Sequence, residues 1–206
     1  PPDVEQVNAI LELASDTPYW STLSFMARTG CRRSECLGLR WMDLDLDAGM
    51  ASIVRSLQRV GRQGLVFQPT KSAKSRRRIA LDGRTVDILR AHQGAQMLTK
   101  AELGSTYQDI GLVFPGELGK PLDPATLTRN FIKLAKRADL KGIRLHDLRH
   151  FHATLLLKNN THLKVVQERL GHASIATTGN IYSHVAPEMQ KGAAETFAAA
   201  MDADGL

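Results

Sequence analysis

Residues 145–152, Leu-His-Asp-Leu-Arg-His-Phe-His, bring together side chains that bind anions and transfer protons. In a helix that turns by about 100° per residue, His146, Arg149 and His150 project from one face. A guanidinium grips an anionic oxygen through two donors, and an imidazole donates or moves a proton near neutral pH. The spacing therefore predicts a site for an anionic oxygen. The alternative is a polar face exposed to solvent.

The opposite face of the same predicted helix is apolar. Leu148, Phe151 and Leu155 recur there, and we expect them to pack in the core together with His152. A zinc site built from the three histidines is disfavoured, because His152 points away from the other two and no cysteine or carboxylate completes a ligand set. We predict no bound metal and no cofactor.

A second reactive group follows, with Leu-Gly-His172 and then Thr-Thr-Gly-Asn-Ile-Tyr182-Ser-His-Val over residues 177–185. A tyrosine with a pKa of about 10 is a poor nucleophile unless its proton is removed or its phenolate is stabilised. The nearby histidine and the arginine–histidine face could supply both. Alternatively, the Tyr182 ring packs and its hydroxyl forms a hydrogen bond, as in most helical tyrosines.

Arg32 stands in a turn between two predicted helices. Gly30 is expected to end the first helix and Ser34 to cap the second. A turn can aim a guanidinium into a cleft, and Glu35 can fix its orientation. The alternative is an ordinary surface arginine.

Residues 69–79, Pro-Thr-Lys-Ser-Ala-Lys-Ser-Arg-Arg-Arg-Ile, predict a cationic hairpin tip. Such a tip can follow a phosphate backbone or carry a lysine to a leaving group. Lys71 and Lys74 are the candidate lysines. The alternative is a nonspecific basic loop.

The composition fits one globular domain with a polyanionic partner. The chain has 206 residues and a formal net charge of +6. Its apolar runs fall short of the roughly 18 residues that a membrane span needs, so we predict no membrane association. Cys31 and Cys36 are expected to be reduced thiols of a cytoplasmic protein.

Hydrophobic periodicity predicts a mainly α fold with one small antiparallel β-sheet, an α+β arrangement. Strands are expected over residues 50–60, 65–69 and 77–81. Helices are expected over residues 4–14, 18–29, 34–39, 84–98, 124–138, 146–158, 162–170, 174–182 and 187–201.

Six residues fall in the order and context of the active-site series of the phage integrase (tyrosine recombinase) family, which this chain resembles: Arg32, Lys71, His146, Arg149, His172 and Tyr182. Residues 29–35 reproduce the family's Thr-Gly-x-Arg-x-x-Glu context, and residues 177–185 its Thr-Thr-x-x-Tyr-x-His-Val context. The resemblance implies a DNA breaking–rejoining catalytic-domain fold over residues 1–206. The family usually adds an N-terminal core-binding domain, and the linker-like start Pro-Pro-Asp-Val suggests that this chain lacks it.

The resemblance also implies a site-specific recombinase that acts on double-stranded DNA. Tyr182 would attack the scissile phosphorus and form a 3′-phosphotyrosine. Arg32 and Arg149 would hold the non-bridging oxygens as charge develops, and His172 would add a hydrogen bond.

Two further residues would move protons. His146 would act on the proton of Tyr182, and Lys71 would protonate the leaving 5′-oxygen. Lys71 is favoured over Lys74 by its distance from the strand that follows. The covalent intermediate keeps the energy of the broken bond, so rejoining needs no ATP, and the cationic side chains supply the charge that a metal would otherwise provide.

Family members cut DNA within an assembly of four protomers on two sites. The predicted last helix, residues 187–201, has an apolar stripe that suits docking on a neighbouring protomer or packing within its own chain. The stripe consists of Met189, Ala193, Phe197, Ala200 and Met201. A bacterial or phage-encoded protein acting in the cytoplasm is expected.

Three other functions share some of these features. A type IB topoisomerase would use the same chemistry, but the Leu-Gly-His and Thr-Thr-x-x-Tyr contexts favour a recombinase. A catalytically idle DNA-binding module would be expected to lose at least one of the six residues. A metal-dependent nuclease would need a cluster of carboxylates, and the sequence suggests none.

Overall fold

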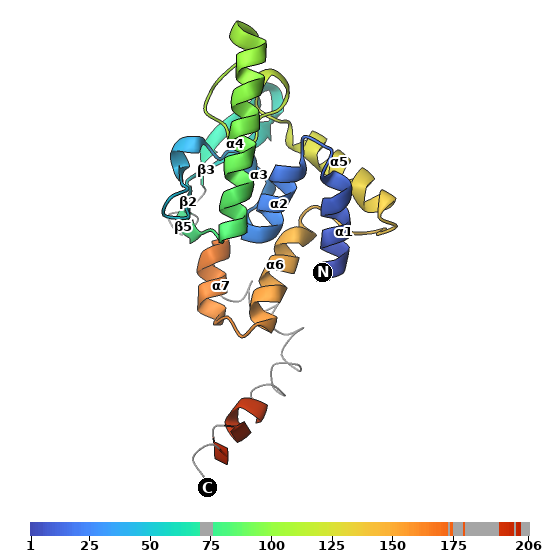
Figure 1. Ribbon diagram of the computed structural model, residues 1–206, viewed down its shortest axis with the longest axis vertical. Helices are drawn as coiled ribbons and strands as arrows, with labels where there is room; N and C mark the ends of the chain where they lie inside the picture. Colours follow the sequence, from blue (N-terminus) through green and yellow to red (C-terminus); the bar gives the residue numbers. More distant parts are fainter. Residues whose placement is uncertain (71–75, 173, 175–178, 180–193, 200, 203–206) are drawn as a thin grey trace.

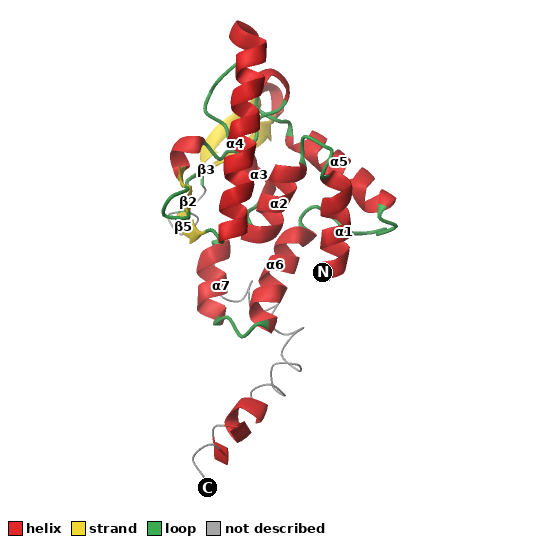
Figure 2. Ribbon diagram, viewed as in Figure 1, coloured by secondary structure: helices red, strands yellow, loops and turns green. Residues whose placement is uncertain are grey.

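The structure is a computed structural model that describes residues 1–70, 76–172, 174, 179, 194–199 and 201–202. It is mainly helical, with small antiparallel sheets at one side (Figures 1 and 2), which confirms the predicted fold class. The predicted hairpin tip over 71–75, nearly all of the predicted helix 174–182 and the first part of the predicted helix 187–201 lie outside the described residues.

The described chain runs through seven α-helices and five strands, with short 3₁₀ turns between them. The helices are α1 (Val4–Ala14), α2 (Trp20–Thr29), α3 (Arg33–Leu37), α4 (Gly83–Leu103), α5 (Pro124–Arg137), α6 (Asp147–Lys158) and α7 (Leu163–Leu170). The strands are β1 (Leu44–Asp45), β2 (Met50–Ile53), β3 (Arg55–Val60), β4 (Gly64–Pro69) and β5 (Arg77–Ala80). Residues 194–199 and 201–202 are also helical.

Helix α2 lies at the centre of the molecule. It contacts α1, α3, α4 and α6, and its side chains from Ser21 to Ala27 are buried. Large apolar residues such as Phe25 and small polar ones such as Thr22 and Ser24 alternate along it, so neighbouring helices approach on several sides. The C-terminal end of α2 is therefore held firmly where α6 and α7 meet it.

Gly30 ends α2 in the left-handed conformation, with a φ of 67°. A Cβ atom at this position would lie 2.6 Å from Cδ2 of Leu170 and 2.8 Å from Cδ2 of His152. Only glycine tolerates both the backbone conformation and this close approach. The glycine thus brings the ends of α2 and α7 against α6.

The predicted strand over 50–60 is divided at Val54, and the single predicted sheet is in fact two. One sheet has the order β1-β2-β5, and the other pairs β3 with β4; all the pairs are antiparallel. Strict alternation after Ala51 and Ile53 would point Arg55 into the core. Instead the next strand buries Ser56 and Leu57, and Arg55 pairs with Asp43.

Two helix boundaries also differ from the sequence prediction. Arg32, and not Ser34, is the N-cap residue of α3, because the Glu35 carboxylate accepts the backbone N–H of Arg32 at 3.0 Å. Helix α4 continues to Leu103, beyond the predicted end at residue 98. Lys100, in the part of α4 beyond the predicted end, pairs with Asp109 at 2.8 Å, a contact that local periodicity does not reveal.

The predicted core stripe of α6 is correct in its first half and wrong in its second. Leu148 and His152 are buried, but Leu155 is 37% exposed. Ala153 and Leu157 are buried instead, in a separate small cluster with Val166 and Leu170 of α7, because this end of α6 packs against α7.

Cys31 and Cys36 are both buried free thiols. Within the described part of the chain, no helix is both long enough and apolar enough to cross a membrane.

Candidate active site

Arg149 lies at the centre of the candidate site and is only 3% exposed. Its Nη1 donates to the backbone carbonyl of Gly30 at 2.7 Å, and its Nη2 donates to that of Leu170, also at 2.7 Å. Both carbonyls belong to helix ends, where backbone oxygens lack helical partners. The solvated polar face considered from the sequence is therefore not what forms around Arg149.

Arg32 projects from the turn before α3 with its side chain 36% exposed. Its Nη1 donates to Oε1 of Glu35 at 2.7 Å, and its Nη2 donates to the carbonyl of Gly171 at 3.3 Å. The prediction that Glu35 orients Arg32 is confirmed. Arg32 and Arg149 thus bind adjacent carbonyls, of Gly171 and Leu170, at the end of α7.

His172 follows this pair of carbonyls directly. Its backbone N–H donates to the carbonyl of Gln167 at 3.1 Å, and the Gln167 amide donates back to the carbonyl of His172 at 3.2 Å. These bonds fix the residue just after the left-handed turn at Gly171, which has a φ of 66°. The segment 170–172 therefore binds two arginines through its carbonyls and carries His172 beside them.

His146 is the N-cap residue of α6, one turn before Arg149 and His150. The rings of His146 and His150 meet edge to face, with centroids 4.9 Å apart. The predicted clustering of these three side chains on one region of the helix is thus found, with Arg149 the buried member.

A pocket of about 560 Å³ opens over these residues. Arg32, His146 and Arg149 line it, and Arg33, Ser34, Thr128 and Arg144 add further polar groups. A second pocket, of about 810 Å³, lies on the other side of Arg32, between α3, β3 and the start of α5, with Gly171 at its edge. Arg32 lines both pockets, so it stands on a ridge between two concave surfaces.

Burial and neighbouring positive charge shift several pKa values at the site. Burial, with a smaller contribution from Arg32, lowers the pKa of Arg149 to about 9. Burial and the two arginines lower the pKa of His172 to about 4. Partial burial, then His150 and Arg149, lowers the pKa of His146. Burial is the largest cause of each shift, and neighbouring positive charge adds to it; a bound anion would oppose the contribution of the charge.

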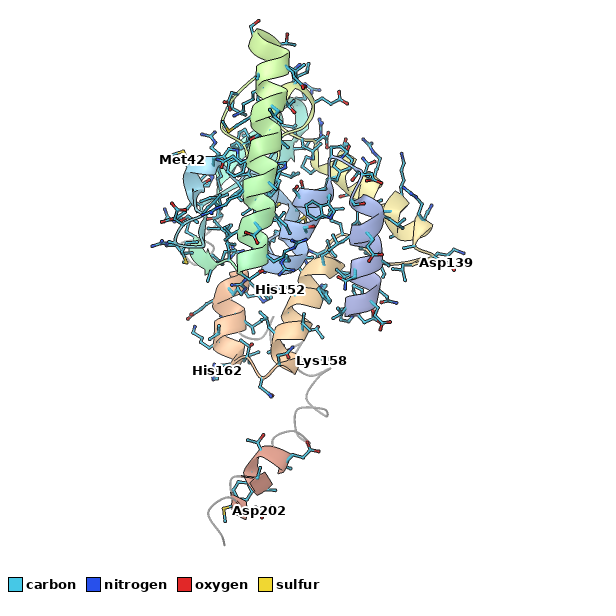
Figure 3. All side chains as sticks on the ribbon, viewed as in Figure 1. Met42, Asp139, His152, Lys158, His162 and Asp202 are labelled. Atoms are coloured by element: carbon cyan, nitrogen blue, oxygen red, sulfur yellow. The ribbon has the colours of Figure 1, made fainter. Side chains whose placement is uncertain are left out.

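The sequence predicted that His152 is buried, but it did not reveal the polar partners of its ring behind the site. His152 lies where α6 meets the end of α7 (Figure 3), and its Nδ1 donates to the carbonyl of Ala27 at 3.2 Å. Because a carbonyl only accepts, Nε2 is left to accept from Nε of Arg169 at 3.0 Å. Burial, followed by the charge of Arg169, lowers the pKa of His152 to about 4, so the ring is neutral.

Arg77 at the start of β5 was also missed, because it stands within a run of three arginines of which its neighbours are exposed. Its side chain is 6% exposed and pairs with Glu35. The signal available in the sequence was Glu35, an isolated acid in a basic region, because a buried acid must pair with a cation.

Two of the six predicted site residues, Lys71 and Tyr182, lie outside the described residues, and so does Lys74. The other four, Arg32, His146, Arg149 and His172, come together as described above. Over the described residues, no group of three or more His, Cys, Asp or Glu side chains is arranged to hold a metal ion.

Solved structures with this fold are integrases and recombinases. The Tn1549 transposon integrase, in complex with transposon right end DNA, matches with a TM-score of 0.82 and 20% identity, over 96% of this chain and 66% of that chain. The XerA recombinase matches with a TM-score of 0.71 and 26% identity, over 92% of this chain and 62% of that chain. The fold is that of a tyrosine recombinase catalytic domain.

Sequence comparison gives the family. The model of the phage integrase family matches residues 2–189. A XerC-like tyrosine recombinase of Caldanaerobacter subterraneus subsp. tengcongensis is 33% identical over 180 residues, 82% of this chain and 46% of the relative. The ICEBs1 integrase of Bacillus subtilis is 32% identical over 174 residues, 84% of this chain and 46% of the relative. The chain belongs to the phage integrase family and spans about half the length of these curated relatives.

Proposed function

We propose that residues 1–206 form the catalytic domain of a site-specific recombinase that cuts and rejoins DNA strands through a 3′-phosphotyrosine at Tyr182. The observation that carries this proposal is the shared anchoring of two guanidinium groups. Arg32 and Arg149 bind neighbouring carbonyls of the segment that also carries His172, beside a pocket that His146 lines.

A phosphodiester suits this arrangement. Arg149 uses two donors on carbonyls and is buried, so its remaining N–H groups point a concentrated charge at the pocket. Arg32 keeps part of its guanidinium exposed on the ridge between the pockets. Together they would hold the two non-bridging oxygens, and would bind them more strongly as charge builds up in the pentacoordinate transition state.

Proton transfer would fall to the less buried groups. With its pKa below the ordinary histidine value, His146 is neutral near pH 7 and can take the proton of Tyr182 as the phenol attacks. His172 would donate a hydrogen bond to the phosphate. Lys71 would protonate the 5′-oxygen as its bond to phosphorus breaks, and rejoining would reverse each step without ATP or a metal.

Double-stranded DNA is the proposed partner. The net charge of +6 favours a polyanion. Related structures were determined as complexes with DNA, including the XerH site-specific recombinase, 25% identical, bound to a palindromic difH substrate. We place the reaction in the bacterial cytoplasm, where such DNA is found.

We also propose that the protein acts as a tetramer on two DNA sites and that the C-terminal helix docks on a neighbouring protomer. The described helical residues 194–199 lie apart from the main body in Figure 1. Phe197 on this segment is 68% exposed, and Met201 is 39% exposed. Apolar side chains on a detached helical segment favour burial against another protomer.

The test of the proposed activity is a trapping experiment. The full-length gene product would be incubated with nicked suicide substrates made from the DNA that flanks its gene, so that the cut strand is lost and the intermediate accumulates. We expect a covalent protein–DNA complex that resists denaturation and forms equally in EDTA. Cleavage without a covalent adduct, or complete loss in EDTA, would replace the proposal with a metal-dependent nuclease.

A further inference from the structure

Arg77 forms an extensive set of buried contacts near the site without reaching the pocket. Its Nη2 donates to Oε2 of Glu35 at 2.9 Å, and its Nη1 donates to Oε1 of the same carboxylate at 3.2 Å. Its Nε donates to the carbonyl of Arg169 at 2.7 Å. One guanidinium therefore joins β5 to α3 and to the end of α7.

Glu35 is shared between two arginines. Its carboxylate accepts the side chain and backbone of Arg32 and, from the other side, the paired donors of Arg77. Burial alone would raise the pKa of Glu35, but the hydrogen bonds and charge of Arg77, followed by those of Arg32, lower it. Glu35 is therefore ionised, and its single negative charge is divided between two cations.

Because Glu35 pairs with two arginines, it only partly neutralises the positive charge of Arg32. With Arg77 present, the Arg32–Glu35–Arg77 group carries one positive charge in excess, and Arg32 is its exposed end. Without Arg77, Glu35 would neutralise Arg32 alone and would lose the bidentate bond that fixes the carboxylate plane.

Arg77 also packs against the turn before His172. A Cβ atom on Gly171 would lie 2.9 Å from Nη1 of Arg77 and 3.1 Å from its Cδ. The Leu-Gly-His sequence thus needs glycine for its left-handed turn and also to admit the Arg77 guanidinium. Removing that guanidinium would leave space beneath the carbonyls that Arg32 and Arg149 bind.

We propose, on the basis of the proposed function, that Arg77 is a positioning residue for the phosphate clamp: it orients Arg32 through Glu35 and holds the 169–172 turn that carries His172. Its side chain is 6% exposed and is not among the residues lining either of the two pockets described above, so we expect it to act through its neighbours and not through a phosphate contact. Among the described contacts, its effect on the reaction would pass through Arg32 and the 169–172 turn.

The variant Arg77→Gln removes the charge and the bidentate grip. We expect single-turnover cleavage of the suicide substrate to slow by about 100-fold, the cost of misplacing a group that contacts the reacting atoms. DNA affinity should stay within about threefold, since one buried charge remote from the phosphates contributes little to binding. The matched control is Arg78→Gln, which removes the same charge from the neighbouring, exposed position on β5.

A double-mutant cycle separates positioning from general damage. Because Arg77 acts on both Arg32 and the 169–172 turn, adding Arg77→Gln to Arg32→Lys should slow cleavage by a factor at least about fivefold smaller than the factor that Arg77→Gln causes in the wild type. Losses that multiply in full, or an Arg77→Gln rate within about threefold of wild type, would overturn the proposal. Arg77→Lys keeps the charge but not the two-donor grip, and it serves as the test variant if Arg77→Gln fails to fold; an Arg77→Lys variant cleaving at the wild-type rate would also overturn it.

Amide exchange provides a readout that needs no activity. In Arg77→Gln, exchange in the peptide covering 163–172 should be faster than in Arg78→Gln, because the Arg169 carbonyl and the Gly171 turn lose their support. Unchanged exchange there would refute the positioning role. Failure of the wild type to form any covalent complex would refute the proposed function, and the exchange result would still decide on Arg77.

Discussion

At the residue scale, Arg149 shows how a buried charge can be made ready for a ligand. Two backbone carbonyls satisfy part of its guanidinium, but neither carries a full negative charge. Burial and the nearby Arg32 lower its pKa to about 9. A phosphodiester in the pocket would supply the missing negative charge. The same Arg149–phosphate contact would then contribute to substrate binding and to stabilisation of the transition state.

The substitution Arg149→Lys should slow cleavage by about 100-fold or more, since an ammonium cannot bind both carbonyls and a non-bridging oxygen in one plane. Single-turnover cleavage and thermal unfolding would be measured together, with the exposed Arg144→Lys, which lines the same pocket, as the control. An Arg149→Lys enzyme that cleaves near the wild-type rate would remove Arg149 from the clamp.

The two lysines of the 71–75 segment can be separated by the leaving group. If Lys71 is the general acid, Lys71→Ala should be badly impaired on an ordinary phosphodiester and largely rescued on a 5′-bridging phosphorothiolate, whose sulfur leaves without protonation. Lys74→Ala should lose only salt-sensitive binding, equally on both substrates. Rescue of Lys74→Ala instead would move the acid to that position, and rescue of neither would mean that the turn only holds DNA.

At the element scale, helix ends rather than helix faces build the site. The end of α2 at Gly30 and the end of α7 at Gly171 both turn into the left-handed region and offer their carbonyls to arginines. The start of α6 brings His146, and the start of α3 brings Arg32. The positions of the functional side chains therefore depend on where the helices begin and end.

Replacing Gly171 by alanine should destabilise the protein by at least about 1–2 kcal/mol from the backbone conformation alone, with a further cost from the contact with Arg77. Gly94, in the exposed middle of α4 with nothing near its Cβ position, is the matched control. Gly94→Ala should stabilise by about 1 kcal/mol. Denaturant unfolding would compare the two, and equal effects would contradict the account of the turn.

Local sequence patterns predicted much of this arrangement. Caps and hydrophobic periodicity placed α1, α5 and α7 within a residue or two, and the contexts around Arg32 and Arg149 singled out two arginines that the structure brings together. The division of the strand at Val54, the length of α4 and the burial of Arg149 depend on contacts with other parts of the chain. Arg77 and Glu35 meet across 42 residues, a pairing that no local pattern encodes.

At the scale of the whole molecule, a compact body carries the clamp, and the described helical segment 194–199 lies apart from it (Figure 1). The main body buries its apolar side chains in a core around α2, whereas Phe197 and Met201 expose apolar surface. In the proposed assembly, a neighbouring protomer on DNA would cover this exposed surface.

Phe197→Ser should leave the thermal stability of the monomer within about 0.5 kcal/mol of wild type, because the ring is exposed. It should reduce the fraction of tetrameric complex on DNA, measured by analytical ultracentrifugation. Met42→Ser is the control, since Met42 is 79% exposed on the main body (Figure 3). A destabilised monomer with unchanged assembly would show that the Phe197 ring packs within its own chain.

We propose that Tyr182 attacks the scissile phosphate, and peptide mapping of the trapped protein–DNA complex would identify the residue that carries the DNA. After nuclease and protease digestion, mass spectrometry should find the nucleotide remnant on the peptide containing Tyr182. Tyr182→Phe should form no adduct while binding DNA with nearly wild-type affinity, because only the nucleophilic oxygen is lost. Tyr107→Phe, whose hydroxyl accepts a hydrogen bond from Gln96, should form the adduct normally. An adduct that persists in Tyr182→Phe, or a remnant mapped to another residue, would contradict the claim.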